Sequence, residues 1–73
     1  MKVWIGRDWD GLTAFLVEPE RYYLNPFDEE DFIFVNPSPN PELSIPLETE
    51  SFPEIPVYGL ITIEIDSLDE LED

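Results

Sequence analysis

Six of the eight prolines of this chain fall between residues 36 and 56, and this density limits what the middle of the chain can fold into. Proline lacks a backbone N–H and fixes φ, so it interrupts a helix and removes a hydrogen bond from a central strand. We therefore expect the segment to be extended, in polyproline or loop conformations. Apolar residues recur in it and indicate that it packs across one face of a sheet: Leu43, Ile45, Leu47, Phe52 and Ile55.

The first eighteen residues have the pattern of a β-hairpin. Side chains of residues 2–7 and 12–18 divide into two alternating sets, as in strands whose successive side chains point to opposite faces. Between them, Asp8-Trp9-Asp10-Gly11 predicts a tight turn, because glycine tolerates positive φ and aspartate bonds back to the backbone. The turn begins like a calcium loop, but its glycine comes too early and position 17 is valine, so we do not interpret it as a metal site.

The remaining apolar runs predict an all-β or β-dominated fold. Residues 31–35 and 57–65 are expected to be strands, and residues 21–24 a short one. We expect a small sheet of three to five mostly antiparallel strands, in which the N-terminal hairpin pairs with 31–35 and with 57–65. The organisation is a single small β domain over residues 1–66, followed by a frayed acidic C-terminal tail over residues 67–73.

The composition excludes several kinds of chemistry. The chain has no Cys and no His, so disulfides, Cys/His zinc sites and His-assisted nucleophiles are ruled out. Its three glycines are isolated, so no glycine-rich phosphate loop is present. A domain of 73 residues seldom encloses an active-site pocket. We therefore predict that the protein is not an enzyme, with no catalytic residues, no metal and no cofactor.

Charge is the strongest functional signal in the sequence. Eighteen Asp and Glu face three basic residues, Lys2, Arg7 and Arg21, giving a net charge of -15. Such a surface is complementary to a basic protein. Pairs of carboxylates two residues apart recur, and on a strand the two members would lie about 6.7 Å apart. This distance is close to twice the spacing of about 3.4 Å between phosphates along one strand of a nucleic-acid duplex. These pairs are Asp8/Asp10, Glu18/Glu20, Glu48/Glu50 and Glu64/Asp66.

We predict an acidic binding protein that docks on a basic protein surface, and in its specific form a nucleic-acid mimic that inhibits a host or defence enzyme. The expected binding residues are the dense run Asp28, Glu29, Glu30 and Asp31, then Glu48 and Glu50, with Trp9 as a separate apolar contact at the hairpin tip. A plainer interpretation is that the charge only maintains solubility.

The expected partner is therefore a basic protein, and a nucleic-acid-binding enzyme fits this description. Direct nucleic-acid binding is disfavoured because the chain has no basic groove. No apolar run approaches the length of a membrane span, so we expect no membrane contact and a cytoplasmic protein. The alternative function is a non-catalytic structural or accessory subunit that homodimerises through an exposed strand edge.

The N-terminal motif carries a resemblance to known sequences. Trp4 to Leu12, with Phe15 and Glu18-Pro19 after it, resembles the opening of small bacterial, phage and mobile-element proteins of no assigned activity. Those proteins begin with a strand, an Arg-Asp-x-Asp-Gly turn, a strand and a proline, and some carry a Phe-Pro-Glu segment like Phe52-Pro53-Glu54 before a last apolar strand. The resemblance implies a hairpin-based β domain and favours a phage counter-defence role, without assigning any functional residue.

Overall fold

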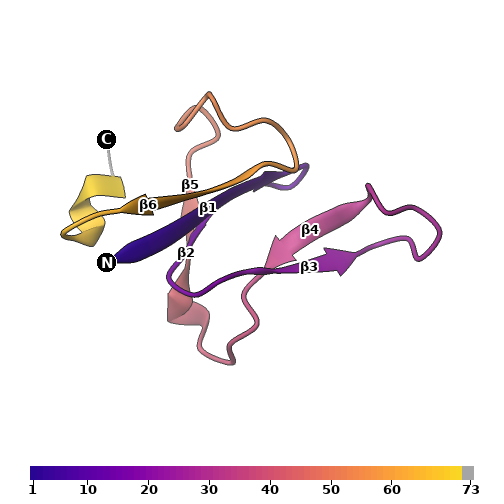
Figure 1. The fold of residues 1–73 in the computed structure, drawn as a ribbon, viewed down its shortest axis with the longest axis horizontal. Coiled ribbons are helices and arrows are strands. Elements are labelled where there is room, and N and C mark those ends of the chain that lie inside the picture. Colours follow the sequence, from indigo (N-terminus) through magenta and orange to yellow (C-terminus); the bar gives the residue numbers. More distant parts are fainter. Residues whose placement is uncertain (72–73) are drawn as a thin grey trace.

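Short strands make up most of the regular structure in the computed structural model, which describes residues 1–71 (Figure 1). In chain order the elements are β1 (Lys2–Asp8), β2 (Gly11–Phe15), β3 (Glu20–Tyr23), β4 (Phe32–Val35), the 3-10 turn η1 (Pro41–Leu43), β5 (Ser44–Leu47), β6 (Leu60–Glu64) and the 3-10 turn η2 (Leu68–Leu71). The predicted β-dominated fold is confirmed. Neither helical turn is long and apolar enough to cross a membrane.

The main sheet has four antiparallel strands in the order β5-β2-β1-β6. The predicted hairpin is present as β1 and β2, with Asp8 opposite Gly11 and only Trp9 and Asp10 between the strands. The Asp8 carboxylate accepts a hydrogen bond from the Asp10 amide at 2.9 Å, which is the local bond that the turn sequence predicts. Gly11 has φ of 140°, a value that other residues rarely adopt.

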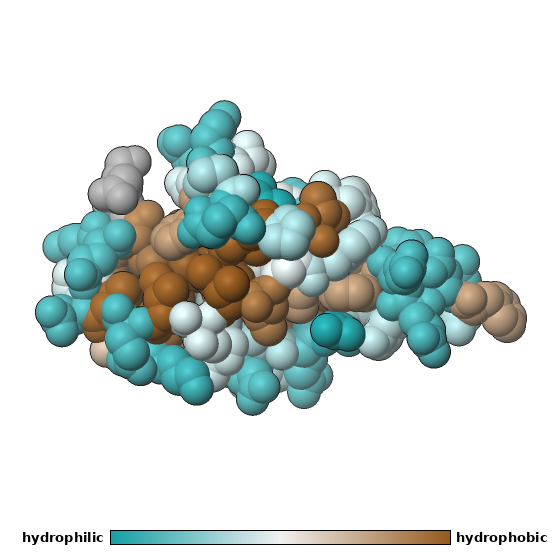
Figure 2. Space-filling view, turned by 45° about the horizontal axis from the view of Figure 1, so that its top comes forward, coloured by the Kyte–Doolittle hydropathy of each residue, from teal (hydrophilic) through white to brown (hydrophobic). Residues whose placement is uncertain are grey.

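One face of the main sheet is mostly apolar, and Arg7 of β1 is a charged residue on this face. Val3 and Ile5 of β1 are fully buried at its centre, and directly paired residues of the neighbouring strands extend the same face: Ile61, Ile63, Leu12, Ala14, Ile45 and Leu47. Residues of the proline-rich segment and the C-terminal end cover it, notably Ile55, Ile65 and Leu71. In the space-filling view of Figure 2, apolar residues gather in the middle of the molecule and hydrophilic residues surround them.

The opposite face holds a second, aromatic cluster. Phe15 of the main sheet packs there with Phe32 and Phe34 of β4, and these three rings are buried. Gly6 makes this docking possible, because a Cβ at this position would lie 2.8 Å from Cδ2 of Phe34. The Asp8 carboxylate adds a bond by accepting from the Phe34 amide at 3.0 Å.

The pairing predicted for residues 31–35 is wrong. β4 pairs with β3 in a separate two-stranded sheet, not with the N-terminal hairpin. The eight intervening residues allow β3 and β4 to close a local hairpin at a small cost in chain entropy. The aromatic face of β4 then packs on the main sheet, and the hairpin projects beyond the sheet on the right of Figure 1.

The proline-rich segment contains a strand that the sequence did not predict. Residues 44–47 form β5, paired to β2, although Pro46 lies within it. β5 is an edge strand, so the missing N–H of Pro46 can face away from the sheet. β2 and β6 are shorter than the runs 12–18 and 57–65, since the chain bends at residues 16–17 and turns at 56–59.

A single arginine fixes the rest of the proline-rich segment. The Arg7 guanidinium donates to four backbone carbonyls, at 2.7 Å to Ile55, 2.9 Å to Thr49, 2.9 Å to Ser51 and 3.2 Å to Phe52. The Arg7 backbone also bonds on both sides, since its amide donates to Gly59 and its carbonyl accepts from Tyr58. Arg7 therefore acts as the anchor of residues 49–59.

The C-terminal end is packed more closely than the predicted tail. Residues 68–71 form η2, and Leu71 is 5% exposed in the apolar core. The Glu70 carboxylate accepts from the amides of Asp66 and Ser67, which is half of a capping box. The prediction of a frayed tail is thus wrong for residues 67–71, because Leu71 gains burial. Residues 72–73 of that prediction lie outside the described part.

Candidate functional site

The densest acidic run lies on the loop of the β3–β4 hairpin. We call residues 24–31 the acidic loop. Its backbone is closed by a bond from the Leu24 amide to the Asp31 carbonyl at 2.8 Å. Two side chains hold its turns, since Asn25 Oδ1 accepts from the Phe27 amide at 3.0 Å and Asp28 Oδ1 accepts from the Glu30 amide at 2.9 Å. The loop thus has a defined shape that its own side chains maintain.

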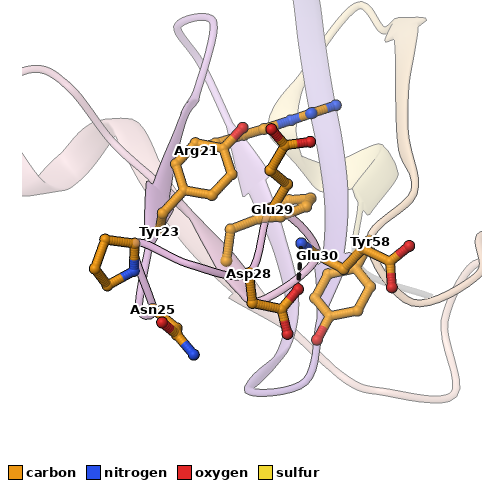
Figure 3. Close-up of a pocket in the computed structure, with 9 residues that line it drawn as sticks. Arg21, Tyr23, Asn25, Asp28, Glu29, Glu30 and Tyr58 are labelled. Atoms are coloured by element: carbon orange, nitrogen blue, oxygen red, sulfur yellow. Dashed lines mark hydrogen bonds between the residues drawn. The ribbon is translucent and has the colours of Figure 1, made fainter.

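An open groove of about 980 Å³ lies beside this loop, and its lining combines carboxylates with aromatic rings (Figure 3). Tyr23 and Tyr58 lie on opposite sides of Asp28 in this view. Both rings contact Phe32, with centroids 5.7 Å and 4.9 Å away, and we call Tyr23, Phe32 and Tyr58 the aromatic trio. The remaining lining residues are Arg21, Asn25, Pro26, Glu29 and Glu30.

A cation of the protein itself already lies in this groove. The guanidinium of Arg21 is 4.8 Å from the centroid of Phe32, within the range of a cation–π contact. No ion pair joins Arg21 to a carboxylate within residues 1–71, where the one pair is that of the Met1 amine with Glu64 at 3.7 Å. The aromatic ring is therefore the main partner of this guanidinium.

Tyr58 reaches the groove from an unusual backbone conformation. Its φ is 68°, in the left-handed region that costs a residue with a bulky side chain about 1–2 kcal/mol. The hydrogen bond of its amide to the Arg7 carbonyl holds this conformation. Strain of this kind is enriched at functional positions. Here its effect is to place the Tyr58 ring against Phe32.

Within residues 1–71, none of the cationic side chains forms an ion pair with a carboxylate. Arg7 binds backbone carbonyls, Arg21 lies on Phe32, and the Lys2 ammonium lies 5.1 Å from the centroid of the Trp4 ring. Within the described residues, all Asp and Glu side chains except Asp8 and Asp31 are exposed. The protein thus presents a strongly negative surface, with the acidic loop as its densest ordered part.

The structure brings together some of the predicted binding residues and separates others. Asp28, Glu29 and Glu30 line the groove, whereas Asp31 is half-buried at the start of β4 and does not. Glu48 and Glu50 are exposed on the segment after β5 and do not line it. Trp9 is 60% exposed at the tip of the β1–β2 hairpin, also outside the groove.

The strand spacing expected of the four carboxylate pairs is wrong. No pair has both members on one strand: Asp8/Asp10 spans the hairpin turn, Glu18/Glu20 brackets Pro19, Glu48/Glu50 follows β5, and Glu64/Asp66 straddles the end of β6. Within residues 1–71, no three acidic side chains are placed to hold a metal ion.

Sequence reasoning missed the aromatic half of the groove. Tyr23 and Arg21 belong to a strand that was predicted, but nothing in their spacing points to Tyr58, which lies 35 residues further along the chain. Phe32 is buried in the aromatic cluster and also lines the groove. Phe27 is 95% exposed on the acidic loop and is, like Trp9, a large exposed apolar side chain.

Comparison with known protein families, with curated proteins and with solved structures found no match. The resemblance of the N-terminal motif to small bacterial and phage proteins therefore stays a prediction.

Proposed function

We propose that this protein is a non-catalytic binding protein whose acidic surface docks on a basic protein, with the acidic loop as the main contact. The observation that carries the proposal is the scarcity of ion pairs, since within residues 1–71 the one pair joins the Met1 amine to Glu64. The protein carries a net charge of -15, and its cationic side chains bind carbonyls and rings rather than carboxylates. Such a charge repels itself, and a basic partner would relieve that repulsion.

The order of the acidic loop supports the assignment of the contact. A charged group that is already fixed loses less entropy on binding than one on a mobile segment. Asn25 and Asp28 fix the turns of the loop through their side chains, and β3 and β4 hold its two ends. Asp28, Glu29 and Glu30 would therefore be presented in a constant arrangement.

The class of partner follows from the charge. Enzymes and other proteins that bind nucleic acid carry extended basic surfaces, which makes them the natural targets of so acidic a domain. In its specific form, the proposal is that the protein mimics nucleic acid and thereby inhibits a host or defence enzyme. The mimicry would depend on the acidic loop, since the carboxylate pairs do not follow strands. In such a complex, added nucleic acid should displace the protein.

The proposal is tested by capturing partners from the source cell with the wild-type protein and with a neutralised variant. The variant carries Asp28→Asn, Glu29→Gln, Glu30→Gln and Asp31→Asn, and Asn at position 28 keeps an acceptor for the Glu30 amide. We expect basic proteins to be captured at about 0.05 M salt, released at about 0.5 M, and lost from the variant.

A matched control separates the acidic loop from the general charge. It neutralises four exposed carboxylates elsewhere, Glu18, Glu20, Glu42 and Glu54, each changed to Gln. Capture that survives in this control supports the loop as the contact. Equal loss in both variants would assign binding to the whole charged surface. Capture that is unaffected by either variant and by salt would show that the acidic surface does not bind the partner.

A second candidate function is self-association through β6. This strand is an edge of the main sheet and contains no proline, whereas the opposite edge, β5, contains Pro46. An uncovered edge is a template for pairing, so two copies would join their sheets there as a structural or accessory subunit. Thr62→Pro removes an N–H from β6, and sedimentation at high protein concentration would distinguish a wild-type dimer from a monomeric variant. A wild-type monomer at all concentrations would contradict this function.

A further inference from the structure

We infer that the groove beside the acidic loop receives an arginine side chain of the partner, whose guanidinium takes the position that Arg21 occupies over Phe32. This inference rests on the proposed function, because it specifies the group of the basic partner that the site recognises. The groove adds a second observation to the acidic run, since the aromatic trio lines it together with Asp28, Glu29 and Glu30.

The lining of the groove matches both parts of a guanidinium. A guanidinium is planar and weakly hydrated, so its face stacks on aromatic rings, while its edge presents N–H donors to carboxylates. Phe32 and the two tyrosines that contact it provide the rings, and Asp28, Glu29 and Glu30 provide the acceptors. An ammonium group has no such planar face, so arginine should be preferred to lysine.

Arg21 shows that a guanidinium fits the site. It lies 4.8 Å from the Phe32 centroid and is itself exposed, with no ion pair to hold it there among residues 1–71. An exposed side chain of this kind can leave at a small cost, because cation–π contacts at exposed sites are weak. Arg21 therefore acts as an internal occupant that competes with the incoming group.

The volume of the groove leaves room for an occupant from outside. At about 980 Å³ it lies at the upper end of the range for ligand pockets, and it is open to solvent. The site is also the place where an apolar contact with the partner is available, since Tyr23 is 46% exposed beside it and Phe27 is 95% exposed on the same loop. Aromatic residues around a charged centre are typical of binding hot spots.

The test uses acetylated hexa-arginine and hexalysine peptides as probes, which carry equal charge, and measures their dissociation constants by calorimetry. For the wild-type protein we expect hexa-arginine to bind roughly two- to fivefold more tightly than hexalysine, the size of one exposed cation–π contact. Tyr58→Asn and Tyr23→Leu should remove this preference. Asn tolerates the left-handed backbone of position 58, and Tyr23 is on an exposed strand, so folding is maintained in at least one variant.

Arg21→Met provides the sharper arm of the test. The change removes the internal occupant of the groove. Hexa-arginine should therefore bind the Arg21→Met variant roughly two- to fivefold more tightly than it binds the control variant. The matched control is Lys2→Met, which makes the same change in net charge and also removes a cation from an aromatic ring, that of Trp4. A gain confined to Arg21→Met supports the inference.

The two proposals fail in different ways. If both peptides bind equally, with a steep salt dependence, and the groove variants change nothing, the arginine site is wrong and the acidic binding function stands. If neither peptide binds at low salt, both are wrong. If Arg21→Met and Lys2→Met give the same gain, the effect is one of net charge, and Arg21 does not compete for the groove.

Discussion

Replacing Arg7 by methionine should destabilise the protein more than any other single change to a charged residue. Methionine keeps much of the length of the side chain but has no donors. Four carbonyls of residues 49–55 would lose a hydrogen bond at once, although that of Phe52 keeps the Ile55 amide as a donor. The loop that covers the apolar face of the sheet would lose its anchor. The segment includes Ile55, which is 2% exposed in the core.

The size of the effect follows from the exposure of these bonds. The contacts to Ile55, Ser51 and Phe52 are partly buried, whereas the contact to Thr49 is exposed, where water can replace the guanidinium. At about 1 kcal/mol of net stabilisation per intramolecular hydrogen bond, the three partly buried bonds give about 3 kcal/mol. A domain of this length has about 4–11 kcal/mol in total, so Arg7→Met should remove a large fraction of it.

Urea unfolding followed by the fluorescence of Trp4 and Trp9 measures this loss directly. With a slope of about 1 kcal/mol per molar urea, the midpoint should fall by roughly 3 M. Arg21→Met is the matched control, since it makes the same charge change and loses only a cation–π contact of about 0.5–1 kcal/mol. Arg7→Lys should recover less than half of the loss, because an ammonium lacks the planar fork. If Arg7→Met and Arg21→Met unfold at the same urea concentration, Arg7 is not the anchor.

Three further changes test other features. Gly6→Ala should cost about 1–3 kcal/mol, because the added methyl group meets the Phe34 ring; an unchanged midpoint in urea would mean that the ring moves aside freely. Leu71→Ala should cost about 2–3 kcal/mol and the exposed Leu68→Ala less than about 1 kcal/mol, and equal small losses would contradict the packing of η2. Raising NaCl from about 0.01 M to about 1 M shortens the screening length from roughly 30 Å to 3 Å and should raise the melting temperature by several degrees, whereas a constant or falling value would show that self-repulsion is unimportant.

Local patterns predicted much of the sheet. The alternation around Val3 and Ile5 and the turn at Gly11 were sufficient for the hairpin, because both depend on residues close in sequence. The apolar run of residues 57–65 predicted β6 as a further strand paired with this hairpin. β5 was missed because Pro46 argues against a strand, and only its position at the sheet edge, a tertiary fact, removes the objection.

The candidate site was predictable only in its charge. The run of carboxylates from Asp28 to Asp31 is visible in the sequence, and the structure places it on the loop of a hairpin. The aromatic wall was not predictable, because Tyr58 comes from a distant turn and reaches Phe32 through a backbone conformation that its residue type disfavours. The role of Arg7 was hidden for a similar reason, since its acceptors are backbone carbonyls, which carry no sequence signal.

The central position of β1 has a consequence for the order in which the chain is made. β1 is synthesised first, but its second neighbour, β6, lies more than fifty residues later. At about 5–20 residues per second, the ribosome needs roughly 3–10 s to produce the residues between them. During that interval the edge of β1 that later pairs with β6 has no partner, and the apolar face of the N-terminal hairpin is uncovered. The sheet can therefore close only after β6 has been made, and the mutual repulsion of acidic nascent chains on neighbouring ribosomes would protect them from joining through these unfinished edges.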